Sequence, residues 1–179
     1  MIPDESLNFK QLLKNIKAIV LDVDGVLSSC QVLIEPDGEL QRNTNVKDGF
    51  VVQLATRMGI RIGIITGGKS DAVVKRYNKI GVDDVYYQVK DKNTALDEFM
   101  NKHNLKPSEI LYMGDDLPDY RVMQRVGVAT CPLDAAQEIK AISLYVSQYK
   151  GGEGCVRDII EQVLRTQGKW MTNEAFVLC

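Results

Sequence analysis

The segment at residues 18–23, AIVLDV, constrains the fold more than any other feature of this chain. Its apolar residues fall on both faces of the expected strand, which is typical of a parallel strand covered by helices on two sides. The apolar run ends in Asp22, and Asp24 and Gly25 follow it. Residues two apart in a strand point to the same face, so the sequence predicts two carboxylates side by side where a buried strand ends.

Two neighbouring carboxylates repel each other unless one takes up a proton or a cation lies between them. Oxygen ligands without a nearby His or Cys favour Mg²⁺ among the common cations. A solvated strand end is the alternative interpretation, because Asp-x-Asp-Gly is also a common turn sequence.

The rest of the chain alternates between short apolar segments and amphipathic segments, which predicts parallel strands joined by crossover helices. The expected fold is therefore α/β, a Rossmann-like three-layer α/β/α arrangement around a parallel sheet. Further strands are expected at residues 61–66, 83–88, 109–114, 128–130 and 144–148, and helices at 5–16, 70–81, 93–104, 117–127, 134–142 and 155–167. Sheets of this kind bind ligands at the carboxyl ends of their strands.

Residues 30–46 interrupt the alternation and predict an inserted β-hairpin that turns at Pro-Asp-Gly. Val32, Leu33 and Ile34 would place apolar side chains on both of its faces. Either a partner chain covers the hairpin in an oligomer, or the hairpin packs on its own domain.

Length and charge narrow the class of protein. The 179 residues are expected to form a single domain, and the net charge of −2 contains no long run of one sign, so nucleic-acid and membrane-surface binding are not indicated. No apolar run approaches the roughly 20 residues of a membrane span, and no signal peptide is recognisable. The four cysteines lack metal-ligand or redox spacing, and the expected location is the cytoplasm.

Polar residues follow the later strands as well. Thr66 opens the glycine-rich turn TGGKS, which offers donors to an anion such as phosphate, and Lys92 follows the next strand. The segment GDDLPD then supplies three acids that can help to hold a divalent cation: Asp115, Asp116 and Asp119. A carboxylate beside a cation can attack phosphorus, and its neighbour can protonate the leaving alcohol.

The motifs DVDGV, IITGG, KDK and GDDLPD, in this order, resemble the four motifs of the haloacid dehalogenase superfamily of phosphatases. The resemblance implies Asp22 as nucleophile, Asp24 as general acid and base, and Thr66 and Lys92 as phosphate ligands. It also implies a Mg²⁺ site formed by Asp22, the Asp24 carbonyl and Asp115, supported by Asp116 and Asp119. The short intervals between the motifs leave no room for a cap domain.

The hairpin, NVKDG at 45–49 and GGEGCVRD at 151–158 resemble the capless 3-deoxy-D-manno-octulosonate 8-phosphate phosphatases. That resemblance implies a homotetramer, release of a sugar acid for lipopolysaccharide synthesis, and substrate contacts by Lys47, Asp48, Gly67, Arg76 and Arg157. Two residues depart from the pattern: many of those enzymes have Arg where this chain has Gly68, and GGRG where it has Glu153. The related 2-keto-3-deoxynononate 9-phosphate phosphatases have GGEG, but NVKDG and the extended tail fit the eight-carbon branch better.

Two further alternatives stay open. A non-catalytic, regulatory module of the same fold would be expected to lack at least one reacting residue, and this chain has all of them. The tail at residues 168–179, with Trp170 and Phe176, either packs on its own domain or reaches a neighbouring subunit and helps to close its site.

Overall fold

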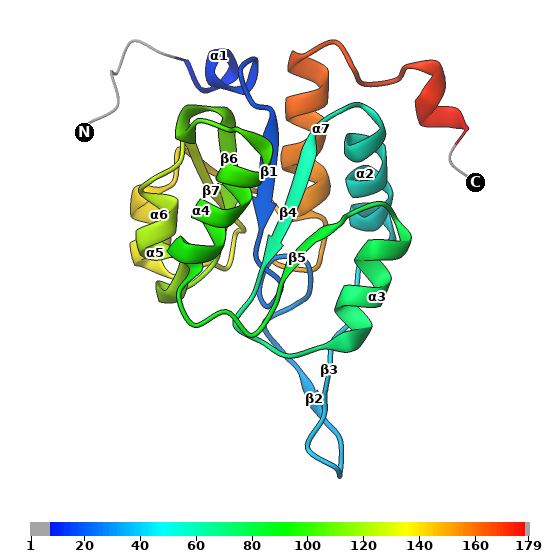
Figure 1. Cartoon of the computed structure of the whole chain (residues 1–179), viewed down its shortest axis with the longest axis vertical. Coiled ribbons are helices and arrows are strands. Elements are labelled where there is room, and N and C mark those ends of the chain that lie inside the picture. The colour runs from blue at the N-terminus through cyan, green and yellow to red at the C-terminus, as the bar shows by residue number, and fades with distance from the viewer. Residues whose placement is uncertain (1–7, 178–179) are drawn as a thin grey trace.

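The computed structural model describes residues 8–177, and its centre is a six-stranded parallel sheet (Figure 1). The strands are β1 (Ala18–Leu21), β4 (Arg61–Ile65), β5 (Asp84–Tyr86), β6 (Ile110–Met113), β7 (Val128–Cys131) and β8 (Tyr145–Val146). Their order is β5-β4-β1-β6-β7-β8, and every pair in it is parallel. β1 and β6 are buried along their whole length, as the apolar segments predict.

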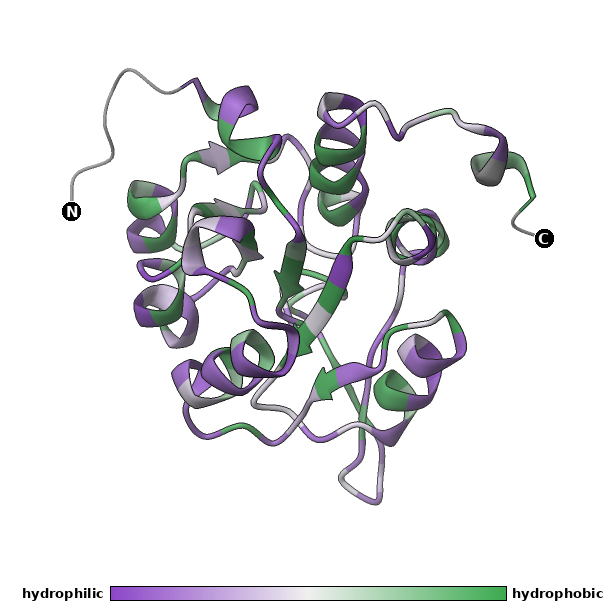
Figure 2. Cartoon of the chain, turned by 45° about the horizontal axis from the view of Figure 1, so that its top comes forward, coloured by the Kyte–Doolittle hydropathy of each residue, from purple (hydrophilic) through white to green (hydrophobic). Residues whose placement is uncertain are grey.

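Helices cover both faces of the sheet, which confirms the three-layer α/β/α prediction. One face carries α1 (Phe9–Leu13), α2 (Val46–Arg57), α3 (Asp71–Lys79) and α7 (Cys155–Thr166); the other carries α4 (Lys92–His103), α5 (Leu117–Met123) and α6 (Gln137–Ile142). Each layer encloses its own apolar core against the sheet. Figure 2 shows the apolar helix faces directed inward and the polar faces outward.

Polar side chains begin the helices that follow the strands. Ser70 accepts a hydrogen bond at the N-terminus of α3, Asp91 at that of α4, and Asp116 at that of α5. Side-chain caps of this type fix where a helix begins. The loops after β4, β5 and β6 are thereby held at one edge of the sheet, where the functional residues lie.

The inserted hairpin pairs β2 (Leu33–Ile34) with β3 (Leu40–Gln41) in antiparallel register. It projects from the molecule at the edge where the sheet strands end (Figure 1). Leu33 and Ile34 are 63% and 70% exposed, so the hairpin does not bury these two apolar residues on its own domain.

Several elements are shorter than the sequence predicts. The first helix spans only Phe9–Leu13, and residues 5–7 of its expected range lie outside the described part of the chain. The helix expected to reach residue 127 ends at Met123. The chain turns there into β7, and Gly127 packs so closely on Ser108 that a Cβ at position 127 would lie 2.7 Å from the Ser108 carbonyl oxygen.

The tail after α7 packs in part on its own domain. Trp170 lies against the guanidinium groups of Arg157 and Arg165, and Thr172 donates to the Met58 sulfur at the end of α2. A short 3₁₀ helix, η2 (Asn173–Phe176), follows at the end of the molecule opposite the hairpin. Among the helices of residues 8–177, none has the length and apolar character that crossing a bilayer requires.

Candidate active site

The carboxyl ends of the central strands meet in a cleft of about 800 Å³ that we call the strand-end cleft. Its lining includes six of the residues that the sequence singles out: Asp22, Asp24, Thr66, Gly67, Lys92 and Asp115. They follow four separate strands of the sheet, β1, β4, β5 and β6. The sheet topology therefore brings together the residues to which the motifs gave catalytic and metal-binding roles.

Asp22 occupies the end of β1, at the floor of this cleft. Its backbone N–H donates to the Met113 carbonyl of β6, which extends the sheet pairing by one residue. Its carboxylate accepts from the backbone N–H of Val23 at 2.7 Å and pairs with the Lys92 ammonium at 2.8 Å. Burial, together with the nearby charge of Asp119, raises the pKa of Asp22 well above its ordinary value.

Lys92, the first residue of α4, is buried between two carboxylates. Its Nζ lies 2.8 Å from Asp22 Oδ2 and 2.7 Å from Asp119 Oδ1. Burial alone would lower the pKa of Lys92, but the two acids outweigh it and the pKa is raised. The ammonium is therefore held in its charged form beside the carboxylate that is expected to react.

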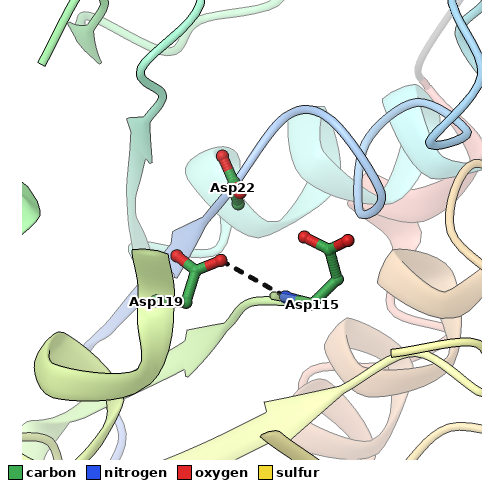
Figure 3. Close-up of side chains that lie close together, drawn as sticks. All are labelled: Asp22, Asp115 and Asp119. Atoms are coloured by element: carbon green, nitrogen blue, oxygen red, sulfur yellow. Dashed lines mark hydrogen bonds between the residues drawn. The ribbon is translucent and has the colours of Figure 1, made fainter. Parts of the chain in front are cut away.

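Asp22, Asp115 and Asp119 form an acidic cluster (Figure 3). Each offers an oxygen within 4.8 Å of the others, close enough for one divalent cation to contact all three. Burial and the charge of Asp119 raise the pKa of Asp115 to about 7. Crowded, poorly solvated carboxylates of this kind gain stability when a cation binds between them, so the donor set fits Mg²⁺.

Asp119 also links the cluster to its surroundings through hydrogen bonds from three neighbouring groups. Its Oδ1 accepts from the Lys92 ammonium and from the Tyr112 hydroxyl, both at 2.7 Å, and its Oδ2 accepts from the backbone N–H of Asp115. Asp116, in contrast, is exposed at the start of α5 and accepts from the backbone N–H of Leu117. Of the two expected supporting acids, the structure brings only Asp119 into the cluster.

Asp24 points to a different side of the cleft. Its two oxygens accept from the guanidinium of Arg42, from Nε at 2.6 Å and from Nη2 at 3.0 Å. Thr66 begins the loop after β4, and its hydroxyl accepts from the backbone N–H of Gly68. The two carboxylates of DVDGV thus have separate environments rather than sharing one partner.

The expected substrate contacts do not all reach the strand-end cleft. Lys47 and Arg157 line a second cleft, between α2 and α7, with a volume of about 760 Å³. Arg76 lines a third one, of about 560 Å³, together with Arg42 and Lys69. Only Gly67 of the expected set lies in the strand-end cleft.

Asp48 is fully buried, and the structure does not place it where a substrate could touch it. Its Oδ1 accepts from the backbone N–H of Arg157 at 2.7 Å, at the N-terminus of α7. Its Oδ2 has no hydrogen-bond partner within the described residues. Burial raises the pKa of Asp48 to about 6, although the hydrogen bond from the Arg157 backbone and the nearby backbone of Gly154 oppose the shift.

Three contributions to the site were not predicted from the sequence. Arg42 lies in a polar stretch after the hairpin, and no motif marks it. Tyr112 was detectable as the one hydroxyl in the apolar strand ILYM. Gly25 has a φ of +83°, and a Cβ there would lie 2.0 Å from Asp115 Oδ2, so the glycine after DVD is what lets the two acidic loops approach.

The sequence of this chain is similar to those of known phosphate-ester hydrolases. Residues 28–127 match the model of the haloacid dehalogenase-like hydrolase family. The 3-deoxy-D-manno-octulosonate 8-phosphate phosphatase KdsC of Escherichia coli K12 is 35% identical over 156 residues, which is 87% of this chain and 83% of that protein.

Solved structures extend the likeness to the fold. The crystal structure of 3-deoxy-D-manno-octulosonate 8-phosphate phosphatase from Moraxella catarrhalis, in complex with magnesium, phosphate and KDO, has a TM-score of 0.86 at 32% identity, and the match covers 90% of this chain and 92% of that one. A hypothetical protein from Xanthomonas campestris has a TM-score of 0.91 at 28% identity, over 99% of this chain and 97% of that one.

Proposed function

This chain belongs to the haloacid dehalogenase-like hydrolases, and from that premise we propose that it hydrolyses 3-deoxy-D-manno-octulosonate 8-phosphate with Mg²⁺ as cofactor. The observation that carries the proposal is the strand-end cleft itself. In one cavity it combines the buried Asp22 carboxylate paired with Lys92, the acidic cluster, and the turn at Thr66 and Gly67 that is proposed to bind phosphate. The similarity to phosphatases acting on this sugar acid supports the choice of substrate.

Asp22, Asp115 and the backbone carbonyl of Asp24 would hold the Mg²⁺, with Asp119 keeping Asp115 and Lys92 in place. When bound, the cation supplies positive charge that offsets the repulsion between an anionic phosphoryl group and the carboxylates. Lys92 adds a fixed positive charge beside Asp22.

Asp22 is the proposed nucleophile. One of its oxygens would form a bond to phosphorus as the bond from phosphorus to the sugar oxygen breaks, giving an aspartyl-phosphate. Asp24 would give its proton to the departing sugar oxygen and later take a proton from the water that cleaves the aspartyl-phosphate. Thr66 and the backbone of Gly67 would donate to the phosphoryl oxygens at the start of the loop after β4.

The sugar-acid end of the substrate is proposed to lie toward the third cleft, where Lys69 and Arg76 offer cationic side chains. Cationic side chains suit a carboxylate, and arginine can pair with it through two hydrogen bonds. Lys47 and Arg157 lie in the second cleft, so their contact with substrate stays a prediction that would require the substrate or a second subunit to bridge the clefts.

The proposed oligomer is a homotetramer. The exposed apolar residues of the hairpin, Leu33, Ile34 and Leu40, support burial against another copy of the chain. We also propose a cytoplasmic location and release of the sugar acid for lipopolysaccharide synthesis, both by analogy with the related phosphatases.

A nine-carbon substrate is the second candidate, because GGEG is present at 151–154 and Gly68 supports neither branch. Phosphate release should be measured from the eight-carbon acid, from 2-keto-3-deoxynononate 9-phosphate and from simple sugar phosphates, each with Mg²⁺ and with EDTA. Mg²⁺-dependent preference for the eight-carbon acid supports the proposal, and preference for the nine-carbon acid replaces its substrate. Absence of release from every ester would favour the non-catalytic module.

A further inference from the structure

The guanidinium of Arg42 is built into the site rather than resting on its surface. It contacts both oxygens of Asp24, with Nε at 2.6 Å from Oδ1 and Nη2 at 3.0 Å from Oδ2. The Arg42 side chain is only 5% exposed, and its Nη1 also donates to the Leu40 carbonyl of β3. Arg42 directly follows β3, so the base of the hairpin delivers the group to Asp24.

This guanidinium lies in space that the absence of a side chain at Gly68 leaves open. A Cβ at that residue would lie 2.9 Å from Arg42 Nη2, 3.3 Å from Asp24 Oδ2 and 3.5 Å from Thr66 Oγ1. The Arg42 guanidinium, the Asp24 carboxylate and the Thr66 hydroxyl therefore all border the space beside Gly68. Gly68 does not have a positive φ, so its backbone is compatible with alanine and its role here is to leave room.

We propose that Arg42 is a positioning residue that orients Asp24 for proton transfer, and that Gly68 makes the space in which it does so. Two-point contact fixes the plane of a carboxylate as well as its place. The Asp24 side chain is 38% exposed and, apart from Arg42, accepts only a long hydrogen bond of 3.4 Å from the Ser28 hydroxyl among the described residues. Without Arg42, the carboxylate would be free to turn into solvent, away from Thr66.

The inference rests on the proposed function insofar as Asp24 is the acid that protonates the leaving group. A misplacement of about 1 Å in a reacting group can cost about 10²-fold in rate. We therefore expect Arg42→Ala to lower kcat/KM by about that factor for the alkyl phosphate that the wild-type enzyme hydrolyses fastest. kcat/KM is the appropriate constant because it covers the steps up to departure of the leaving group.

Gly68→Ala provides the decisive comparison. Its methyl group would displace the end of the Arg42 side chain, so it should lower kcat/KM in the same manner, and the double variant should lose no more than the Arg42→Ala variant alone. Losses that multiply would overturn the proposal, because they would show that the two residues act independently. Lys17→Ala removes the Lys17–Glu109 ion pair just before β1 begins, away from the strand-end cleft, and serves as the control for loss of a cation–carboxylate pair.

Two readouts separate positioning from damage to the fold. With p-nitrophenyl phosphate, whose leaving group departs without a proton, Arg42→Ala should cost much less than with the alkyl ester; equal losses on both esters would contradict the proposal. NMR of the arginine Nε–H groups should show an Arg42 proton protected from exchange in the wild type and exposed in Gly68→Ala. Such protection without phosphatase activity would refute the proposed function alone, whereas an unprotected Arg42 proton in the active wild type would refute this inference alone.

Discussion

Replacing Asp48 by asparagine tests the account of the junction between α2 and α7. Asp48 is fully buried, one of its oxygens accepts from the backbone N–H of Arg157, and the other has no partner within the described residues. In the Asp48→Asn variant, the amide oxygen can keep the bond from Arg157, and the side chain carries no charge at any pH. The substitution therefore removes the burial of a charge while preserving shape and capping.

The sign of the effect follows from proton linkage. Burial raises the pKa of Asp48 from its ordinary value of 3.8 to about 6, so the folded state binds a proton that the unfolded state has already released. This contribution to stability is fully present below the unfolded pKa and is lost as pH rises from about 4 through about 6. At about 1.4 kcal/mol for each pH unit, the wild type should lose about 3 kcal/mol of unfolding free energy over this range that the variant keeps.

Urea unfolding monitored by circular dichroism, with EDTA present throughout, measures this difference. The free energy of unfolding of Asp48→Asn minus that of the wild type should rise by about 3 kcal/mol between pH of about 4 and about 8. Asp37→Asn, in the exposed hairpin turn, provides a control for loss of a carboxylate. A difference between Asp48→Asn and the wild type that stays constant with pH would refute the reasoning, because it would mean that burial does not raise the pKa of Asp48.

Three further predictions concern the active site and the tail. Gly25→Ala should weaken Mg²⁺ binding on the order of 10- to 100-fold, because its Cβ would displace the Asp115 carboxylate; unchanged affinity by calorimetry would contradict the described approach of the two loops. Tyr112→Phe removes a hydroxyl that donates to Asp119 and should cost about 1 kcal/mol of unfolding free energy as well as lowering kcat; wild-type values for both would show that this bond does not support the cluster. Deletion of residues 169–179 should lower kcat/KM while the fold persists, at a stability cost of about 1 kcal/mol for loss of the Trp170 contacts with Arg157 and Arg165; unchanged kinetics would exclude a role for the tail in closing a site.

The main strands and the centre of the site follow from the sequence because they depend on local pattern. Strands buried on both faces consist of continuous apolar runs, and Asp22, Thr66 and Asp115 follow such runs closely. Parallel pairing brings their carboxyl ends to one edge whatever the details of the loops. The position of the strand-end cleft therefore follows from the sequence alone.

The side-chain contacts around the cleft depend on how loops and helices pack, which a single sequence does not specify. Arg42 reaches Asp24 across an interval of 18 residues, and Asp48 reaches the backbone of Arg157 across 109. In a sequence, a charged residue beside a motif cannot be assigned to substrate contact or to capping of a helix, because both roles use the same residue types. This is why Asp48 was expected at the substrate and is found buried beneath α7.

The most direct test of the central claim is to trap the covalent intermediate during turnover. Borohydride added to the Mg²⁺-loaded enzyme with its phosphorylated sugar acid reduces an aspartyl-phosphate to homoserine, which peptide mass spectrometry can locate. Homoserine is expected at position 22 in the wild type, and none is expected there in the Asp22→Asn variant. Homoserine at position 24, or efficient phosphate release with position 22 left unmodified, would contradict the assignment of Asp22 as the nucleophile.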